Sequence, residues 1–498
     1  MRRSWPLLGL LAVAYLGSRL FDLTRLPLFV DEAIHLDWAR RLVHEGRVLR
    51  ILDDGKLLEV VAMAPTVSWV ADPAWWGRLT TVMVGGLGLW ACFRLGGLAD
   101  ARAGLTASAL YVVCPFTLFY DRMALADGFL SVFAGLALLY SLAFQARPSR
   151  SGSIRLGLAM AAAVLSKVPG LVTLVFPPLC LLVLGLPSGR WRRRLGAAYG
   201  ITLVLIAYPV FHFFTRTGQL GMKAEVAEAD RLAAIQYNGS LVLEWLLSYW
   251  TAPFLVAGVA TALWAASTWK RRELVLAGAS VAPLLVFILV GFHLFPRYVL
   301  LATIPFLALT ARGLCALEAF LATRLGLSSA QRLASCLLLA ALVAGPALER
   351  SWTLLVDPSR ARLPRADRFQ YVEGWPSGYG WAEAAACVRD AAERSPLGVR
   401  LLADRADHRT AIRVLRGYLM NDPKVEIIPV NMRDPRTQAL VGPWARERPA
   451  LVLRSGARPD KLPPLPVTPS YGFERVRAFF KPGGTLVGEL YLAIPRGP

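Results

Sequence analysis

The sequence predicts an α-helical polytopic membrane protein that ends in an extracytoplasmic α/β domain. Of its 498 residues, 55% are hydrophobic and only 18% are charged, whereas a soluble domain carries about 25% charged residues. Apolar runs recur between short polar breaks as far as residue 349, and they have the length that a helix needs to cross a bilayer. Beyond residue 350 the hydrophobic density falls. We therefore expect a transmembrane domain over residues 1–349 and a soluble domain over residues 350–498.

About eleven apolar segments qualify as transmembrane helices. In the first, the long apolar part and Arg19 favour a retained span over a cleaved signal peptide. The fifth is short, and the join that follows it at Lys167–Gly170 fits either a tight hairpin or a broken helix. The segments cover residues 5–24, 78–95, 103–120, 127–144, 154–168, 170–187, 197–214, 251–268, 274–292, 298–314 and 332–349.

The basic residues alternate along these segments in a way that fixes the expected orientation. With the N-terminus inside, the inner segments carry 17 basic residues and three acids, whereas the short outer turns carry only Arg122, Lys167 and Arg297. Inner loops of membrane proteins are enriched in Lys and Arg. We therefore expect a multi-pass protein of the cytoplasmic membrane with a cytoplasmic N-terminus and an outer C-terminal domain. This bias explains much of the net charge of +21, so no nucleic-acid partner is expected.

Two outer regions show secondary structure of their own. In the loop after the first span, Ile34, Trp38 and Leu42 fall on one face of a helix over Asp31–Gly46, which is typical of a helix lying in the membrane interface. A second apolar stretch, Leu57–Val70, predicts the same. The C-terminal region predicts strands at Val399–Ala403, Val425–Val430 and Leu451–Leu453, and helices at Ala382–Ala392 and His408–Leu419.

Ionisable residues gather at the predicted outer ends of the spans, where they are costly and often functional. Several carboxylates and several cations at one depth indicate a single site for an anionic, lipid-embedded substrate. Taken singly, each residue also fits a purely structural role, because acids favour helix starts and arginines extend to the interface. The residues are Asp31, Glu32, Lys56, Tyr120, Asp121, Arg122, Asp127, Lys167, His293, Arg297 and Tyr298.

The order and spacing of five motifs over residues 1–315 resemble the bacterial GT-C glycosyltransferases of the protein O-mannosyltransferase and aminoarabinose-transferase type. The chain departs from these families after Lys56, where Leu57 and Leu58 replace two prolines, and before it, where Gly55 replaces an acid that some relatives carry. The motifs are Phe29-Val-Asp-Glu-Ala33, Asp54-Gly-Lys56, Tyr120-Asp-Arg-Met-Ala-Leu-Ala-Asp127, Ser166-Lys167-Val-Pro-Gly170 and Pro296-Arg-Tyr298.

The resemblance implies the GT-C fold and the transfer of a sugar, with inversion, from a polyprenyl-phosphate donor to an acceptor hydroxyl at the outer membrane face. The acceptor is a protein, a glycolipid or a glycan. A divalent metal is compatible with this chemistry, but the residues predict no ligand set and no certain cofactor.

On this hypothesis Asp31 is the general base, because a hydroxyl nucleophile needs a carboxylate within reach. Glu32 and Asp127 position the base or the acceptor. Lys56, Lys167 and Arg297 hold the lipid phosphate, and Arg122 and Tyr298 complete the expected substrate-binding set.

Two other function classes remain open at this stage. A transporter or flippase of lipid-linked sugars also binds anionic lipid, but inverted repeats with interrupted helices in matching halves are not evident in the sequence. A non-catalytic scaffold protein has no need of carboxylates beside an interfacial helix.

Overall fold

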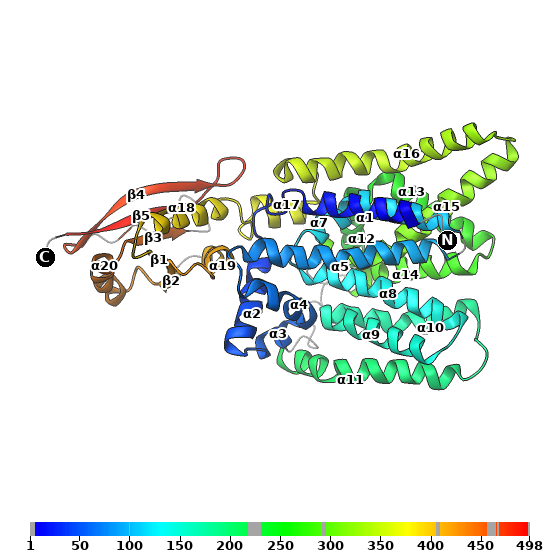
Figure 1. Cartoon of the computed structure of the whole chain (residues 1–498), viewed down its shortest axis with the longest axis horizontal. Coiled ribbons are helices and arrows are strands. Elements are labelled where there is room, and N and C mark those ends of the chain that lie inside the picture. The colour runs from blue at the N-terminus through cyan, green and yellow to red at the C-terminus, as the bar shows by residue number, and fades with distance from the viewer. Residues whose placement is uncertain are drawn as a thin grey trace. The chain divides into compact units, whose positions relative to one another are not determined.

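The computed structural model describes residues 5–98, 100–217, 231–290, 295–404, 409–455, 465 and 468–496. The chain divides into two compact units (Figure 1). The first unit comprises Met1–Leu23, Arg47–Ala62 and Arg78–Pro364. The second comprises Thr24–Gly46, Met63–Gly77 and Arg365–Pro498. The loop after the first span is thus shared between them, and most of the residues around Asp31 belong with the C-terminal region.

The regular elements described in the first unit are all helices, and each of the eleven predicted segments contains one helix or two consecutive helices. Helices α4 and α5 begin in one unit and end in the other. The elements are α1 (Trp5–Leu20), α3 (Leu49–Asp54), α4 (Leu57–Val67), α5 (Pro73–Gly96), α6 (Ala101–Val113), α7 (Pro115–Asp121), α8 (Ala126–Ala146), α9 (Arg150–Ser166), η2 (Val168–Val175), α10 (Phe176–Leu184), α11 (Trp191–Thr217), α12 (Arg231–Tyr249), α13 (Thr251–Ser267), α14 (Arg271–Val290), η4 (Pro296–Ala302), α15 (Thr303–Arg324), α16 (Ser329–Val356) and η5 (Pro358–Arg360).

Within the described residues, six helices are long and apolar enough to cross a membrane, or eight if each of two bent pairs forms one span. In the first pair, α6 and α7 meet at 62° before Pro115, a residue that cannot continue a helix by hydrogen bonding. Helix α1 and the η2–α10 segment are shorter apolar elements. At Lys167–Gly170 the chain turns back in a tight hairpin, one of the two expected alternatives, because α10 ends beside the C-terminal end of α8, close to where α9 begins.

The second bent pair begins between the predicted spans 197–214 and 251–268, where the sequence analysis placed no helix. Helix α12 occupies Arg231–Tyr249 and meets α13 at 110°. The bend is fixed by packing, because Trp250 stacks on Phe306 at a centroid distance of 3.7 Å and donates from Nε1 to Thr303 Oγ1 at 3.2 Å. A hydrophobic pattern cannot show a bend that depends on contacts 50 residues away.

The second unit contains a five-stranded mixed sheet in the order β2-β1-β3-β5-β4. Strands β2, β1 and β3 are parallel, and β5 is antiparallel to β3 and β4. The predicted strands and helices of this region are confirmed, whereas α20, β4 and β5 were not predicted. The elements are α2 (Val30–Glu45), α17 (Arg365–Arg368), η6 (Phe369–Glu373), α18 (Trp381–Arg394), β1 (Val399–Asp404), α19 (Arg409–Leu419), β2 (Val425–Val430), α20 (Pro435–Glu447), β3 (Ala450–Ser455), β4 (Tyr471–Phe480) and β5 (Leu486–Pro495).

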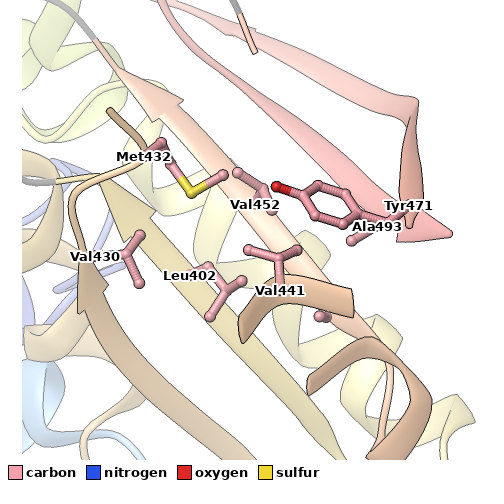
Figure 2. Packing of buried hydrophobic residues seen from close by; sticks show 8 residues of the cluster. Leu402, Val430, Met432, Val441, Val452, Tyr471 and Ala493 are labelled. Carbon is pink, nitrogen blue, oxygen red and sulfur yellow. The ribbon is translucent and has the colours of Figure 1, made fainter. Parts of the chain in front are cut away.

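One face of this sheet carries a hydrophobic core against α20. Leu402 and Val452 project from neighbouring strands toward Val441 of α20, and Tyr471 closes the cluster (Figure 2). Because side chains alternate across a strand, the opposite face is available to α18, and Trp381 there lies against Gly488. The sheet is therefore covered on both faces.

Candidate active site

Asp127 lies in the first turn of α8, where the helix dipole favours a carboxylate. Lys167 lies opposite, at the break between α9 and η2, with an extended backbone. Gly170 makes this break tight, because a Cβ atom there would lie 2.3 Å from the carbonyl oxygen of Ala163. Only glycine lets the chain turn back so closely onto α9.

Two cations share the Asp127 carboxylate. Lys167 Nζ donates to Asp127 Oδ1 at 2.7 Å, and Arg297 Nε lies 3.9 Å from Asp127 Oδ2. All three side chains are largely buried. Lys167 Nζ also lies 4.3 Å from the centroid of the Tyr298 ring, within the range of a cation–π contact. Lys and Arg side chains are suited to phosphate, and here two of them lie side by side in a buried region.

The loop that carries Lys56 packs against the turn of Lys167. Gly55 has a positive φ of 63°, and a Cβ atom there would lie 2.7 Å from Val168 Cγ2. Beside this glycine, Asp53 Oδ1 lies 2.9 Å from His212 Nε2 of α11. The absence of a family acid at position 55 therefore coincides with a close approach that leaves no room for a side chain. Lys56, Asp127, Lys167, Arg297 and Tyr298 thus belong to one region of the first unit.

Asp31 and Glu32 occupy the first turn of α2 in the second unit. Glu32 is fully buried and its Oε2 accepts a hydrogen bond from the backbone N–H of Phe29 at 3.0 Å. This contact caps the helix. Asp31 is partly exposed on the same turn. The acidic pair therefore divides into a capping residue and a more accessible neighbour.

The C-terminal region holds the segment that leads into Asp31. The N–H of Leu28 donates to the Tyr418 hydroxyl at 2.7 Å, and the N–H of Val30 donates to the carbonyl of Pro376 at 3.1 Å. A Cβ atom on Gly378 would lie 2.1 Å from the Leu28 carbonyl oxygen. The glycine is thus required for this close approach of two backbone segments.

Helix α2 packs against α19 within the same unit. Ala33, Leu36 and Ala39 are completely buried, and a Cβ atom on Gly417 of α19 would lie 3.0 Å from Ala33 Cβ. The sequence analysis predicted that a different face of this helix contacts the membrane. On that face, Ile34 and Leu42 are half-buried. The helix is confirmed, and a protein contact accounts for its buried face.

Arg122 contacts backbone, and this contact was not expected from the sequence. Its Nη2 donates to the carbonyls of Phe21 and Asp22, at 2.9 and 2.7 Å. Arg78 Nη1 donates to the next carbonyl, that of Leu23, at 3.0 Å. Asp22 itself has a positive φ of 42°. The two arginines therefore hold the residues that connect α1 to the Asp31 segment, and a role for Arg122 on substrate stays a prediction.

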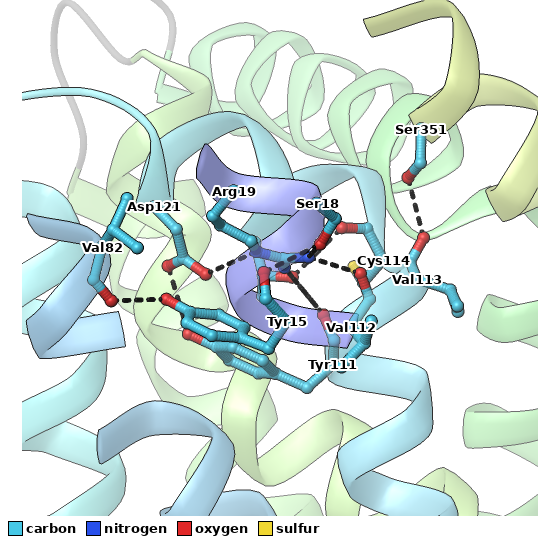
Figure 3. A network of polar contacts seen from close by, with 11 residues as sticks. Tyr15, Ser18, Arg19, Val82, Tyr111, Val112, Val113, Cys114, Asp121 and Ser351 are labelled. Atoms are coloured by element: carbon cyan, nitrogen blue, oxygen red, sulfur yellow. Dashed lines mark hydrogen bonds and ion pairs between the residues drawn. The ribbon is translucent and has the colours of Figure 1, made fainter. Parts of the chain in front are cut away.

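A second charged cluster is built on Arg19 and Asp121, whose pairing the sequence analysis did not predict (Figure 3). Both side chains are buried, and Arg19 Nε lies 3.4 Å from Asp121 Oδ2. Arg19 also donates to the carbonyls of Val112 and Tyr111, and the Tyr111 hydroxyl donates to Asp121 Oδ1 at 3.1 Å. The available signal was Arg19 itself, because a charge inside an apolar helix requires a partner.

Two further expectations concern a histidine and a metal. His293 lies outside the described residues. No group of three or more His, Cys, Asp or Glu side chains that is able to hold a metal ion occurs in the part of the chain that the structure describes.

Comparison with known proteins gives a match only at the level of the fold. No protein-family model and no curated sequence matches the chain. Two crystal structures of ArnT from Cupriavidus metallidurans do, one bound to undecaprenyl phosphate and one in the apo state. Their TM-scores are 0.55 and 0.56 and their sequence identities 16% and 18%, each covering 97% of both chains. The chain therefore has the GT-C fold, as the motifs predicted.

Proposed function

We propose that this protein is a glycosyltransferase that moves a sugar from a polyprenyl-phosphate donor to an acceptor hydroxyl, with inversion, at the outer face of the cytoplasmic membrane. The observation that carries the proposal is the cluster in which Lys167 and Arg297 share a single carboxylate, Asp127. Lys and Arg are the side chains that suit phosphate, so we assign the phosphate of the lipid donor to this cluster.

The fold supports the same ligand class. One ArnT structure with this fold is bound to undecaprenyl phosphate, and the likeness extends over 97% of both chains. Independently, the described helices include six that are long and apolar enough to cross a membrane, which is where a polyprenyl chain resides. The orientation follows from the basic inner loops.

The chemistry assigns a separate task to each charge. Transfer breaks the bond between the anomeric carbon and the phosphate oxygen and forms a bond to the acceptor oxygen. Negative charge develops on the departing phosphate, and Lys167, Arg297 and Lys56 stabilise it. The acceptor hydroxyl loses its proton to Asp31, which acts as general base. For inversion, this base stands on the face of the sugar opposite the phosphate.

In this account Glu32 and Asp127 are positioning residues. Glu32 is committed to the cap of α2 through the Phe29 N–H, so it fixes the backbone that carries Asp31. Asp127 holds Lys167 and Arg297 in place before the lipid binds. Tyr298 keeps the ammonium of Lys167 on its ring face.

The direct test uses the purified full-length protein in liposomes with a panel of undecaprenyl-phosphate-linked pentoses and hexoses. Mass spectrometry should detect release of undecaprenyl phosphate from at least one donor when acceptor extract is present. Asp31→Asn should lower this release by about 10²- to 10⁴-fold, the usual contribution of a general base, while the thermal unfolding midpoint stays unchanged.

Two outcomes would overturn the proposal. One is near-wild-type release of undecaprenyl phosphate by the Asp31→Asn variant. The other is movement of the intact lipid-linked sugar across the bilayer without cleavage of the sugar–phosphate bond, which is the behaviour of a flippase. Glu45→Gln, a substitution at the exposed end of the same helix, serves as the matched control.

A further inference from the structure

Two loops at the far end of α8 from Asp127 carry an unusual set of arginines. They join α8 to α9 and α10 to α11. No Asp or Glu occurs in the sequence between residues 128 and 224, so these loops have no acid nearby in the chain. All but Arg194 are exposed. We call this set the arginine patch, and its members are Arg147, Arg150, Arg190, Arg192, Arg193 and Arg194.

Helix packing brings the two loops together. Helices α9 and α11 run in parallel side by side (Figure 1), and the Thr202 hydroxyl of α11 donates to the Gly157 carbonyl of α9 at 3.1 Å. A Cβ atom on Gly157 would lie 2.7 Å from the Ala198 carbonyl. Gly157 and Ala198 are each seven residues beyond the first residue of their helix, so the two helix starts lie level.

Direct contacts between the loops confirm this arrangement. Arg194 donates from Nη1 to the carbonyl of Pro148 in the other loop. Gln145, at the end of α8, donates to the carbonyl of Gly185 at 3.1 Å. The arginine patch is therefore one continuous surface of the first unit.

Some other arginines at this end of the bundle have acidic partners. Helix α15 runs parallel to α8, since the Ser131 hydroxyl donates to the Leu300 carbonyl just before α15 begins, so the C-terminal part of α15 lies at the same end. There Arg312 pairs with Glu273, and Arg332 pairs with Glu318 at 3.0 Å. Among the described contacts, no member of the arginine patch forms an ion pair.

Helix stability does not explain the arginines. Positive side chains are unfavourable at a helix N-terminus because the dipole is positive there, yet Arg150, Arg192 and Arg193 all lie in first turns. The patch therefore concentrates positive charge that only an external anion neutralises. Trp191, with the Arg192 guanidinium 5.5 Å from its ring centroid, is the residue type that marks the membrane interface.

We propose that the arginine patch binds the phosphate groups of anionic phospholipids in the leaflet at this end of the bundle. Helix α11 begins at the patch and is long and apolar enough to span the membrane, so lipid headgroups reach this surface without leaving their leaflet. By the distribution of basic loops this is the cytoplasmic leaflet. Helix α8, with 21 residues, separates the patch from Asp127 by about 30 Å, so the two sites are distinct.

The test measures binding of fluorescent phosphatidylglycerol to the full-length protein in neutral detergent, with phosphatidylcholine and inorganic phosphate as alternative ligands. The triple variant Arg190→Gln, Arg192→Gln, Arg193→Gln should bind phosphatidylglycerol on the order of 100-fold more weakly. The matched control Lys270→Gln, Arg271→Gln, Arg324→Gln removes three exposed charges from other loops at this end and should change the affinity by less than about twofold.

Three results would overturn the proposal: equal losses in both triple variants, no preference of the wild type for phosphatidylglycerol over phosphatidylcholine, or binding of inorganic phosphate as tight as that of the lipid. If the triple Gln variant fails to fold, the corresponding Lys variant keeps the charge. That variant should retain binding within about tenfold and lose it steeply as salt is raised. Full binding at high salt would also overturn the proposal.

Discussion

Asp121 and Asp127 lie six residues apart and have the same charge, but their surroundings give them different tasks. Asp121 is matched by one cation, Arg19, whose remaining donors reach carbonyl oxygens and a hydroxyl of the bundle (Figure 3). Asp127 instead meets two cations, Lys167 and Arg297, from two separate helix breaks. The Arg19–Asp121 pair joins helices of the bundle, whereas Lys and Arg side chains gathered around one carboxylate are of the type that binds phosphate.

The largest effect is expected from a substitution of Asp121. Asp121→Ala leaves the Arg19 guanidinium buried and uncompensated, so we expect a loss of stability of about 3–5 kcal/mol. The measurement is the fraction of folded protein across a denaturant titration in detergent. The double variant Arg19→Met, Asp121→Leu removes both charges and should recover most of the loss. Equal stability of the Asp121→Ala variant and the wild type would show that the network does not stabilise the bundle.

Asp31 is a third carboxylate to compare, and backbone contacts position the segment that leads into it. Gly378→Ala introduces a Cβ atom 2.1 Å from the Leu28 carbonyl oxygen, so the segment before Asp31 must shift. Because displacements of about 1 Å cost up to about 100-fold in rate, we expect turnover to fall by about 10- to 100-fold with unchanged affinity for undecaprenyl phosphate.

The matched control for this variant is Gly442→Ala on α20, where the nearest atom lies at an ordinary 3.6 Å. It should retain wild-type turnover. If Gly378→Ala turns over normally, the C-terminal region does not position Asp31.

The substitution Asp127→Asn tests the cluster to which we assign the lipid phosphate. The substitution leaves Lys167 and Arg297 without their carboxylate, so undecaprenyl phosphate should bind at least as tightly as to the wild type. Turnover should fall by about tenfold because the cations lose their common anchor. Binding is measured by titration with fluorescent lipid, and turnover by release of undecaprenyl phosphate. Global unfolding comparable to that of Asp121→Ala would show that Asp127 stabilises the fold in the way that Asp121 does.

The smallest expected effect concerns Lys481, a lysine whose described contacts are with backbone carbonyls and not with a carboxylate. Lys481 donates to the carbonyls of Glu373 and Gly374, and burial lowers the pKa of its ammonium to about 8. Between pH 8 and about 10.4, the usual pKa of lysine, the unfolded chain binds more protons than the folded one. Stability should therefore rise as the pH is raised through this window.

The measurement for Lys481 is the thermal unfolding midpoint at pH 7.5 and 9.5. The wild type should gain stability relative to Lys481→Met, which cannot titrate. An identical pH response of the two proteins would refute the lowered pKa.

Sequence analysis predicted those features that depend on local pattern. Long apolar runs predicted the helical segments, and short apolar runs predicted strands β1, β2 and β3. The spacing of the charges along the spans correctly grouped Asp127, Lys167 and Arg297, because alternate helix ends share one side of a membrane.

Features that depend on distant contacts could not be predicted. The Arg19–Asp121 pair joins residues 102 positions apart, and the Leu28–Tyr418 hydrogen bond joins residues 390 positions apart. Strand β4 was hidden because its charged residues and the register shift after Arg475 interrupt the alternation. The contact of Arg122 with backbone carbonyls could not be predicted either, since such acceptors leave no compositional signal.

The central claim, that the Asp127–Lys167–Arg297 cluster receives a lipid phosphate, is tested most directly by comparing the binding of undecaprenyl phosphate with that of undecaprenol. The two lipids differ only in the phosphate. The account predicts that the wild type prefers the phosphate by at least about tenfold, that Lys167→Gln removes most of this preference, and that Lys481→Gln leaves it intact. Equal binding of the two lipids by the wild type, or a full phosphate preference in Lys167→Gln, would contradict it.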